Sequence, residues 1–376
     1  MIGLPRPDAN GGKGDVCLNA RSWLNNHQNE RSSFSSGVTL AGLRSLPRHY
    51  EKSGLDLSYF SERTPEEIGE LAALELDESA TAELQREAKK FTSGECCIFH
   101  CAGSFDTSEL AHQTPQSFLP VPSNATTIKA RITALLLMRL ASAVPVAYRS
   151  ENDGGLFVNL SAIPGSGRLA EKSIKSMRGH TDGVSFPFPY NPSDGTYSQM
   201  ISPSPDIVCL ICLRNPDLVP TKVSEVDASM RRLDGQTIQE LLKQKYIIGC
   251  QNTFRSGTKK ILGDYHIAEN AEVFRLNTGV YEVRFSHSKV VAEEHDTQGK
   301  AALNAFEQAT NDTMADLTLN PGDVVLINNR RMLHGRGRVS EGYGGETRWL
   351  LRSYAMFYEN FYSDFLYVDS SYELIP

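Results

Sequence analysis

Three side chains of metal-binding type stand out in the sequence: His180, Asp182 and His334. His180 and Asp182 are two residues apart, and on an extended strand such residues project to the same face. They can therefore supply two ligands to one ion, and His334 is the best candidate for a third. Two histidines and one carboxylate form a facial triad with open coordination positions, as expected of iron(II) oxygenases. An H-x-D pair alone is weak evidence, so the hypothesis depends on the residues beyond His334.

Two arginines, Arg348 and Arg352, follow in the run ETRWLLRSY. Residues four apart on a strand point the same way, so both guanidinium groups can enter one cavity. A guanidinium binds a carboxylate through two parallel hydrogen bonds. Without the metal motif these arginines would be interpreted as surface or interface ion pairs. Beside it, they suggest two carboxylate-bearing small molecules bound next to each other.

The elements that must position these residues are predicted to be mainly strands. From about residue 145 onward, short apolar runs alternate with Gly, Pro, Asn and Asp, which is typical of an all-β core. Helical patterns at 237–246 and 300–315 interrupt them. This pattern of short strands and a few helices predicts a mainly β fold with flanking helices, built on a double-stranded β-helix or jelly roll. The runs are GLFVNL, DIVCLICL, VYEVRFSHSKVV, DVVLINN and RWLLRSYAMF.

Helical signals dominate the residues before this core. Thr64 and Glu67 form a capping-box pattern around Pro65, which predicts a helix running toward Lys90. A second helix is predicted over 126–143. Residues 1–36 are polar and predict a loosely ordered arm. We expect residues 37–376 to form a single catalytic domain with N-terminal helices and helical insertions.

Composition excludes several classes of protein. Of the 376 residues, 40% are hydrophobic and 22% charged, which is typical of a globular chain, and the net charge is -7. Neither nucleic acid nor a membrane surface is an expected partner, because both call for a basic face. We expect a small molecule instead. With no apolar leader recognised and seven cysteines, an odd number, the chain is expected in the cytoplasm with reduced thiols.

Two cysteine groups raise the alternative of a zinc site. Cys209 and Cys212 form a C-x-x-C, but they lie in the apolar run IVCLICL, which predicts a buried strand. The run GECCIFHCAG gathers a second group, and structural zinc sites usually pair two separated knuckles. We expect ordinary buried or half-buried thiols in both places. The second group is Cys96, Cys97, His100 and Cys101.

The segments around these residues resemble the clavaminate synthase-like branch of the Fe(II)/2-oxoglutarate-dependent dioxygenases, an amino-acid hydroxylase branch distantly similar to taurine dioxygenase. The resemblance is carried by NNRRMLHGR, by RWLLR and by DIVCLICLRNPDLVPTK. It implies Fe(II), 2-oxoglutarate and O₂ as cofactor and co-substrates. It also implies that Arg348 and Thr221 bind 2-oxoglutarate, that Arg352 takes the substrate carboxylate, and that Glu151, in YRSENDGG, takes its α-amino group.

The chain departs from this pattern in two places. Asp182 stands where the arginine and asparagine oxidisers of the branch carry Glu, which leaves the metal site intact. The stretch Arg284-Phe285-Ser286-His287-Ser288 resembles a strand that grips a cationic side chain with two acids. Ser286 and Ser288 replace both acids here. A guanidinium or ammonium tail would lose its partners, so free arginine is disfavoured as the substrate.

The expected reaction is hydroxylation of an unactivated C–H bond of an amino acid or a derivative, with release of succinate and CO₂. Desaturation and ring closure remain open, because the sequence does not separate them from hydroxylation. A different class is a non-redox, cupin-like metal protein that acts as an isomerase or binding module. Such a protein would need the metal triad but neither Arg348 nor Thr221.

Overall fold

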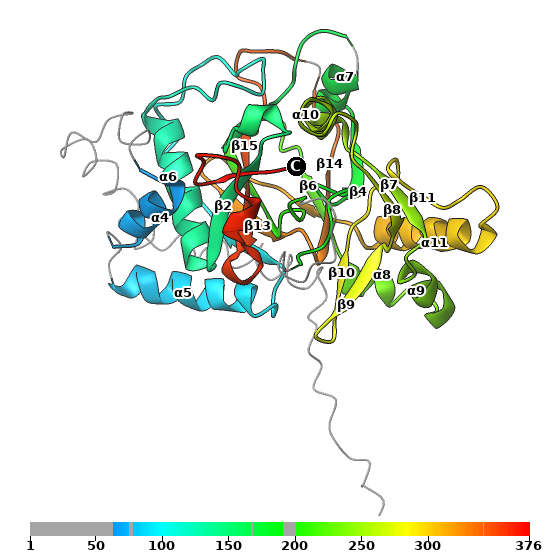
Figure 1. The fold of residues 1–376 in the computed structure, drawn as a ribbon. Helices are drawn as coiled ribbons and strands as arrows, with labels where there is room; N and C mark the ends of the chain where they lie inside the picture. The colour runs from blue at the N-terminus through cyan, green and yellow to red at the C-terminus, as the bar shows by residue number, and fades with distance from the viewer. Residues whose placement is uncertain (1–62, 75–77, 167, 191–200, 341) are drawn as a thin grey trace, which may run out of the picture.

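The structure is a computed structural model that describes residues 63–74, 78–166, 168–190, 201–340 and 342–376. The predicted arm over residues 1–36 lies outside these ranges, as does Cys17. Strands occupy the centre of the molecule in Figure 1, and helices lie on its flanks. The prediction of a mainly β chain with flanking helices is therefore confirmed.

A large sheet of seven strands forms one wall of the centre. Its strand order is β1-β13-β5-β15-β2-β16, and β3 also pairs with β15. All the neighbours run antiparallel except β16 and β2. The strands are β1 (Ile98–Cys101), β2 (Ala143–Tyr148), β3 (Val158–Ser161), β5 (Ile207–Arg214), β13 (Val324–Asn328), β15 (Trp349–Phe357) and β16 (Glu373–Leu374).

A four-stranded sheet with the order β12-β6-β14-β4 forms the second wall. Its members are β4 (Met177–His180), β6 (Thr221–Glu225), β12 (Ala315–Leu317) and β14 (Met332–Arg336). A three-stranded sheet, β11-β7-β8, and the hairpin of β9 and β10 lie to one side (Figure 1). These strands are β7 (Tyr246–Gly249), β8 (Ile267–Ala271), β9 (Phe274–Asn277), β10 (Val280–Val283) and β11 (Val290–Val291).

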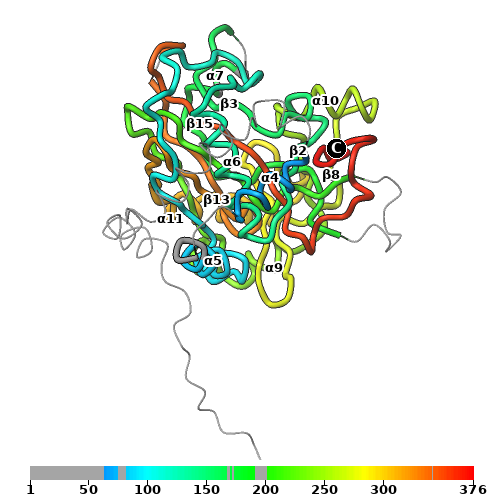
Figure 2. Tube along the Cα trace, turned by 90° about the vertical axis from the view of Figure 1, so that its left-hand side faces the viewer, coloured from blue at the N-terminus to red at the C-terminus, as the bar shows by residue number. Residues whose placement is uncertain are grey.

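Helices cover both flanks, and Figure 2 shows the same arrangement from the side. α4 (Pro65–Leu74), α5 (Glu78–Thr92) and α6 (Ala125–Leu140) flank the large sheet. α8 (Val226–Met230), α9 (Gly235–Leu241) and α11 (Thr297–Thr313) lie beside the small sheets. α7 (Arg168–Ile174) and α10 (Asn252–Leu262) lie at the top of Figure 1. Short 3₁₀ turns are η2 (Asn152–Gly154), η4 (Tyr358–Asn360) and η5 (Ser363–Phe365).

Strand β5 shows how one apolar run serves two cores. Its residues Cys209 and Ile211 pack in the cluster that holds the helices against the large sheet. Val208, Leu210 and Cys212 pack in the cluster between the two central sheets. Alternation along a strand makes both faces of β5 buried, which explains why the run IVCLICL is continuously apolar.

The same alternation excludes a C-x-x-C metal site. Cys209 and Cys212 are three residues apart, so their thiols lie on opposite faces of β5. Burial raises the pKa of Cys212 to about 12. Among the described residues, the cysteines form no disulfide, and those near His100 belong to no metal-binding group. The interpretation as buried or half-buried thiols is confirmed, with Cys96 the half-buried one.

Several helix boundaries differ from the predictions. The capping box is present, since Thr64 N donates to Glu67 Oε2 at 2.7 Å, but the predicted single helix corresponds to α4 and α5. α6 ends at Leu140, and Ala143 already begins β2. The helix predicted over 237–246 is only partly correct, because α9 ends at Leu241 and Tyr246 begins β7. Sheet pairing at these ends prevails over local helix propensity.

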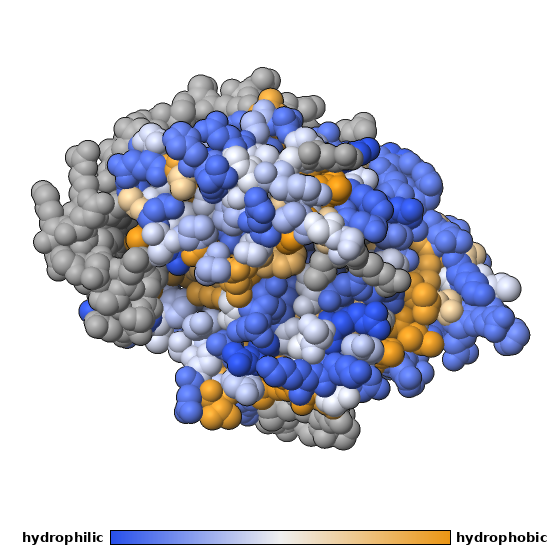
Figure 3. All heavy atoms as spheres, turned by 90° about the horizontal axis from the view of Figure 1, so that it is seen from above, coloured by the Kyte–Doolittle hydropathy of each residue, from blue (hydrophilic) through white to orange (hydrophobic). Residues whose placement is uncertain are grey.

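In the described ranges, no helix is both long and apolar enough to cross a bilayer. Seen from above, the surface is largely hydrophilic with some apolar areas, one of them on the side of β7, β8 and β11 (Figure 3). Ile267 and Val291 are exposed on those strands.

Candidate functional site

The two histidines are brought together by pairing of β14 with β4. His334 lies directly opposite His180 in this antiparallel pair, and their ring centroids are 4.6 Å apart. The Nδ1 atom of His180 lies 2.9 Å from the backbone oxygen of Arg178. A proton on Nδ1 satisfies this contact and leaves the lone pair of Nε2 for a metal ion.

Asp182 completes the group just beyond the end of β4. One of its carboxylate oxygens lies 3.6 Å from His180 Nε2, and the other lies 3.6 Å from His334 Nε2. The ligand atoms of the three residues all lie within 4.8 Å of one another, and all three residues are buried. In the described part of the chain, this is the one group of three or more such side chains close enough to hold a metal ion.

The protonation states of Asp182 and His334 suit metal ligation. Burial alone would raise the pKa of Asp182, but the two histidines that face its carboxylate outweigh burial and hold the pKa well below the usual value. Burial lowers the pKa of His334, and the neighbouring His180 lowers it further. A carboxylate and neutral imidazoles are the forms that bind divalent cations. Two nitrogens and one oxygen on one side fit ferrous iron as a facial triad.

A clamp of side chains holds the backbone around Asp182. The amide of Asp182 donates to Asn329 Oδ1 at 2.9 Å, and Asn329 Nδ2 donates to the Asp182 carbonyl at 3.0 Å. Gln251 Oε1 accepts the amide of Gly183 at 2.7 Å. Gly183 has a φ of 67°, a conformation in which a Cβ would be strained. The chain therefore turns sharply after Asp182 and is fixed on both sides.

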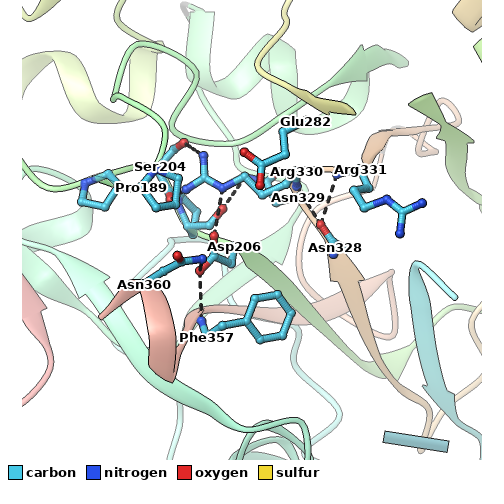
Figure 4. A network of polar contacts seen from close by, with 12 residues as sticks. Pro189, Ser204, Asp206, Glu282, Asn328, Asn329, Arg330, Arg331, Phe357 and Asn360 are labelled. Atoms are coloured by element: carbon cyan, nitrogen blue, oxygen red, sulfur yellow. Dashed lines mark hydrogen bonds and ion pairs between the residues drawn. The ribbon is translucent and has the colours of Figure 1, made fainter. Parts of the chain in front are cut away.

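A buried polar network adjoins Asn329 and holds the segment that carries it (Figure 4). Arg330 Nε donates to Asp206 Oδ1 at 2.9 Å, and Asn360 donates to the other oxygen of Asp206 at 3.0 Å. Asn328 Oδ1 accepts the backbone amide of Arg330 at 3.0 Å. Asn329, Gln251 and this network were not predicted from the sequence. The sequence feature that could have indicated part of this network is the run NNRR, residues 328–331, just before His334.

One cavity of about 730 Å³ adjoins the triad. Of the predicted site residues, all but Glu151 line it directly. Arg348 is 4% exposed, immediately precedes β15, and has no hydrogen-bond or ion-pair partner among the described residues. Burial lowers its pKa to about 10, so it stays a cation at neutral pH. Thr221 begins β6 and is also buried. The lining residues predicted from sequence are His180, Asp182, Thr221, Ser286, Ser288, His334, Arg348 and Arg352.

Glu151 does not line the cavity itself but is hydrogen-bonded to Arg352, which does. Arg352 Nη2 donates to Glu151 Oε2 at 2.6 Å and Nη1 donates to Oε1 at 3.2 Å, so the pair is bidentate. Burial alone would lower the pKa of Arg352, but the charge of Glu151 raises it above the usual value. The two predicted substrate residues are thus joined as a buried ion pair.

The two serines lie on the other edge of β4. Ser286 forms an isolated antiparallel bridge with His180, and it is 6% exposed. Ser288 is exposed at the cavity. The predicted strand VYEVRFSHSKVV is broken here, because β10 ends at Val283 and β11 begins at Val290. The segment between them is shaped by the bridge and by Thr181 N donating to the carbonyl of Phe285 at 2.9 Å.

Known proteins are similar to this chain in sequence and in fold. An enduracididine beta-hydroxylase of Streptomyces hygroscopicus is 26% identical over 253 residues, covering 62% of this chain and 68% of that protein. Clavaminate synthase 2 of Streptomyces clavuligerus is 28% identical over 152 residues, 40% of this chain and 45% of that protein. A solved structure of the non-heme iron oxygenase OrfP, with Fe, succinate and (3S)-hydroxy-L-Arg, matches with a TM-score of 0.70. It is 18% identical and covers 91% of this chain and 98% of its own.

A family model matches residues 162–354, which is more than half of the chain and includes the triad and both arginines. Its description is "Taurine catabolism dioxygenase TauD, TfdA family". The match agrees with the fold similarity to OrfP and with the geometry of the three ligands. The chain therefore belongs to the TauD/TfdA dioxygenase family.

Proposed function

We propose that this chain is an Fe(II)- and 2-oxoglutarate-dependent dioxygenase that hydroxylates an unactivated C–H bond of an amino acid or an amino-acid-derived small molecule. Succinate and CO₂ are the co-products. The observation that carries the proposal is Arg348, a buried cation that faces the same cavity as the triad and lacks a carboxylate partner among the described residues. A buried guanidinium is costly to leave unpaired, so a ligand carboxylate is its natural partner.

The protein's own groups hold and orient the reactants. His180, Asp182 and His334 hold iron, which when bound supplies the activation of O₂. Arg348 pairs with the far carboxylate of 2-oxoglutarate, and the hydroxyl of Thr221 supports it. Both residues lie in the same buried cavity as the triad. Fixing the two reactants side by side lowers the barrier through proximity and orientation.

The pair of Arg352 and Glu151 suits a zwitterionic substrate. An α-carboxylate can bind Arg352 while an α-ammonium binds Glu151, so that one ion pair is replaced by two. Ser286 and Ser288 then line the space for the side chain. The similarity to an enduracididine beta-hydroxylase and to an oxygenase solved with hydroxy-arginine supports an amino-acid substrate.

The architecture is consistent with a jelly roll. Two mainly antiparallel sheets enclose the core between them, and both metal-binding histidines lie in the smaller one. We assign residues 37–376 to a single catalytic domain, of which the described part has three clusters of core residues. The non-redox alternative is not favoured, because an isomerase or binding module has no use for Arg348.

The test is the affinity for 2-oxoglutarate. The purified chain, loaded with Fe(II) without oxygen, should develop the visible charge-transfer band of 2-oxoglutarate chelated to iron. Arg348→Ala should weaken this binding roughly 100-fold, because it removes a charge-assisted bidentate pair. Arg86→Ala, at an exposed position of α5, is the matched control and should bind as the parent does. An unchanged affinity in Arg348→Ala would contradict the assignment.

A further inference from the structure

Tyr354 is a buried polar residue next to the site. It is 3% exposed, and its hydroxyl has no hydrogen-bond partner among the described residues. A buried hydroxyl without a partner destabilises a folded protein, whereas phenylalanine in the same place carries no such cost. The oxygen of Tyr354 is therefore not explained by the fold, and a role in the site would explain it.

Strand β15 directs Tyr354 into the space between the two central sheets. Alternate residues of a strand share a face, so Tyr354 lies on the same face as Arg352. Arg352 lines the cavity, and its guanidinium carbon lies 4.3 Å from the centre of the Tyr354 ring. The ring also packs in the core cluster between the sheets, with Leu350 and Met356 of the same face. These contacts hold the ring in place, but none of them uses the hydroxyl.

The turn that carries Asp182 packs against the same aromatic group. This turn continues to Phe186, whose amide donates to the carbonyl of Gly183 at 2.8 Å. Phe186 stacks on Tyr148 with ring centroids 5.1 Å apart. Tyr148 in turn meets the ring of Tyr354 edge to face, with centroids 6.0 Å apart. Tyr354 is thus packed, through one intervening ring, against the turn that positions the carboxylate ligand.

The Asp182 carboxylate is close enough to act on the Tyr354 hydroxyl. Burial raises the pKa of Tyr354 well above its usual value, Arg352 opposes this rise, and the charges of Asp182 and Glu151 add to it. The hydroxyl therefore stays protonated and can donate a hydrogen bond. Arg352 and Glu151 are already joined by two hydrogen bonds, which leaves Asp182 as the acceptor for Tyr354.

Asp182 has an oxygen available for such a donor. Its two carboxylate oxygens face the Nε2 atoms of His180 and His334 at 3.6 Å each, which is too long for a hydrogen bond. A carboxylate has two oxygens, so one that ligates a metal ion through a single oxygen keeps the other as an acceptor. Carboxylates that ligate metals are in turn usually hydrogen-bonded, and these bonds set their orientation.

We infer that Tyr354 is a positioning residue whose hydroxyl donates a hydrogen bond to the Asp182 oxygen that does not ligate the metal, and so fixes the orientation of this carboxylate. The inference rests on the proposed function, because it concerns the same metal site. Asn329 and Gln251 do not take this role, since both bond to the backbone around Asp182 and not to its carboxylate. The hydroxyl of Tyr354 then serves metal binding at the expense of stability.

The variant Tyr354→Phe removes the hydroxyl and keeps the ring. Anaerobic calorimetric titration of the full chain with Fe(II) alone measures the metal site, and urea denaturation of the metal-free chain measures the fold. We expect the dissociation constant for Fe(II) to rise about 10- to 100-fold, because the carboxylate loses the bond that orients it. The midpoint of denaturation should stay the same or rise, because a buried hydroxyl without a partner has been removed.

Tyr246→Phe is the matched control, because it removes a hydroxyl of the opposite kind. Tyr246 is fully buried on β7 and is not part of the cavity lining. Its hydroxyl donates to the carbonyl of Glu240 at 3.1 Å. Loss of this existing bond should lower the midpoint of denaturation, while the affinity for Fe(II) should stay within twofold of that of the parent.

The inference and the proposed function fail in different ways. Fe(II) binding by Tyr354→Phe that is as tight as that of the parent would overturn the inference and leave the metal site standing. A weaker affinity accompanied by a fall in the midpoint as large as that of Tyr246→Phe would also overturn it, because the hydroxyl would then support the fold. Absence of Fe(II) binding in the parent would instead remove the proposed function itself.

Discussion

At the scale of single residues, the site depends on side chains that touch no reactant. Asn329 is 1% exposed and bonds to both the amide and the carbonyl of Asp182, so it fixes where that carboxylate lies. It also donates to the carbonyl of Pro205 at 2.9 Å. Groups that orient a metal ligand typically change metal affinity by about 10- to 100-fold when they are removed.

Replacing Asn329 should therefore weaken the metal site without abolishing it. Asn329→Ala is expected to raise the dissociation constant for Fe(II) about 10- to 100-fold, because the Asp182 turn loses its clamp. The measurement is anaerobic titration with Fe(II), followed by the charge-transfer band with 2-oxoglutarate present. Asn277→Ala, on the exposed part of β9, is the control. Equal iron affinity in both variants would show that the hydrogen bonds between Asn329 and the Asp182 backbone do not affect iron binding.

The buried pair of Glu151 and Arg352 gives a second prediction at this scale. Glu151→Gln keeps the size of the side chain but leaves the guanidinium without its counter-ion, so we expect a loss of roughly 3 kcal/mol in the free energy of unfolding. Chemical denaturation of the ligand-free chain measures it. The partly exposed pair of Arg149 and Glu373 provides the comparison, and Glu373→Gln should cost about 1 kcal/mol or less. Equal costs would mean that burial does not strengthen the first pair.

At the scale of elements, α10 closes the site by packing on the turn that carries Glu151. Gly257 lies in this helix, and a Cβ built on it would be 2.0 Å from the backbone oxygen of Ser150. No flexible side chain can move aside there, since the obstruction is backbone. Glycine thus allows α10 to approach the segment 150–154 closely enough for the cavity lining to form.

Gly257→Ala should push α10 away from this turn. The expected cost is about 1 to 3 kcal/mol of stability, with a raised KM for the amino-acid substrate because Glu151 is displaced. Gly235→Ala is a sharp control, since Gly235 begins α9 and a Cβ there meets no atom within 4 Å. Thermal unfolding and succinate assays measure both effects. A Gly257→Ala protein as stable and active as Gly235→Ala would refute the close-packing argument.

At the scale of the whole molecule, the features that could be predicted from the sequence are those set by residues close together in the chain or by a repeating apolar pattern. The triad was predicted because His180 and Asp182 are two residues apart, the spacing that projects both to one face of a strand, and because His334 follows soon after the apolar run VVLINN. Asn329 and Gln251 were missed because their role lies in side-chain bonds to a backbone more than 60 residues away. The boundaries of α6 and β7 were missed because strand pairing decides them. The pairing of Glu151 with Arg352 needed three-dimensional proximity of residues 201 apart in the chain.

Stability of the molecule in mild acid offers a last prediction, centred on His266. This residue lies apart from the metal ligands, near Phe186, with a ring-centroid distance of 5.7 Å. Its Nδ1 is buried without a hydrogen-bond partner among the described residues. Burial lowers its pKa to about 4, and the charge of Arg284 contributes to this shift. The folded protein therefore resists protonation of His266, whereas the unfolded chain accepts a proton near pH 6.5.

Because the folded pKa is depressed, the unfolded state binds more protons between about pH 6.5 and pH 4, and the free energy of unfolding must fall as the pH falls through this window. His266 alone should account for up to about 3 kcal/mol of that loss. His266→Gln removes the titrating group, so its stability should decline less steeply than that of the parent. Urea denaturation at several pH values from about 7 to 4 measures the two slopes, with His112→Gln, at an exposed position, as the control. Parallel slopes for the parent and His266→Gln would exclude a neutral buried imidazole at this position.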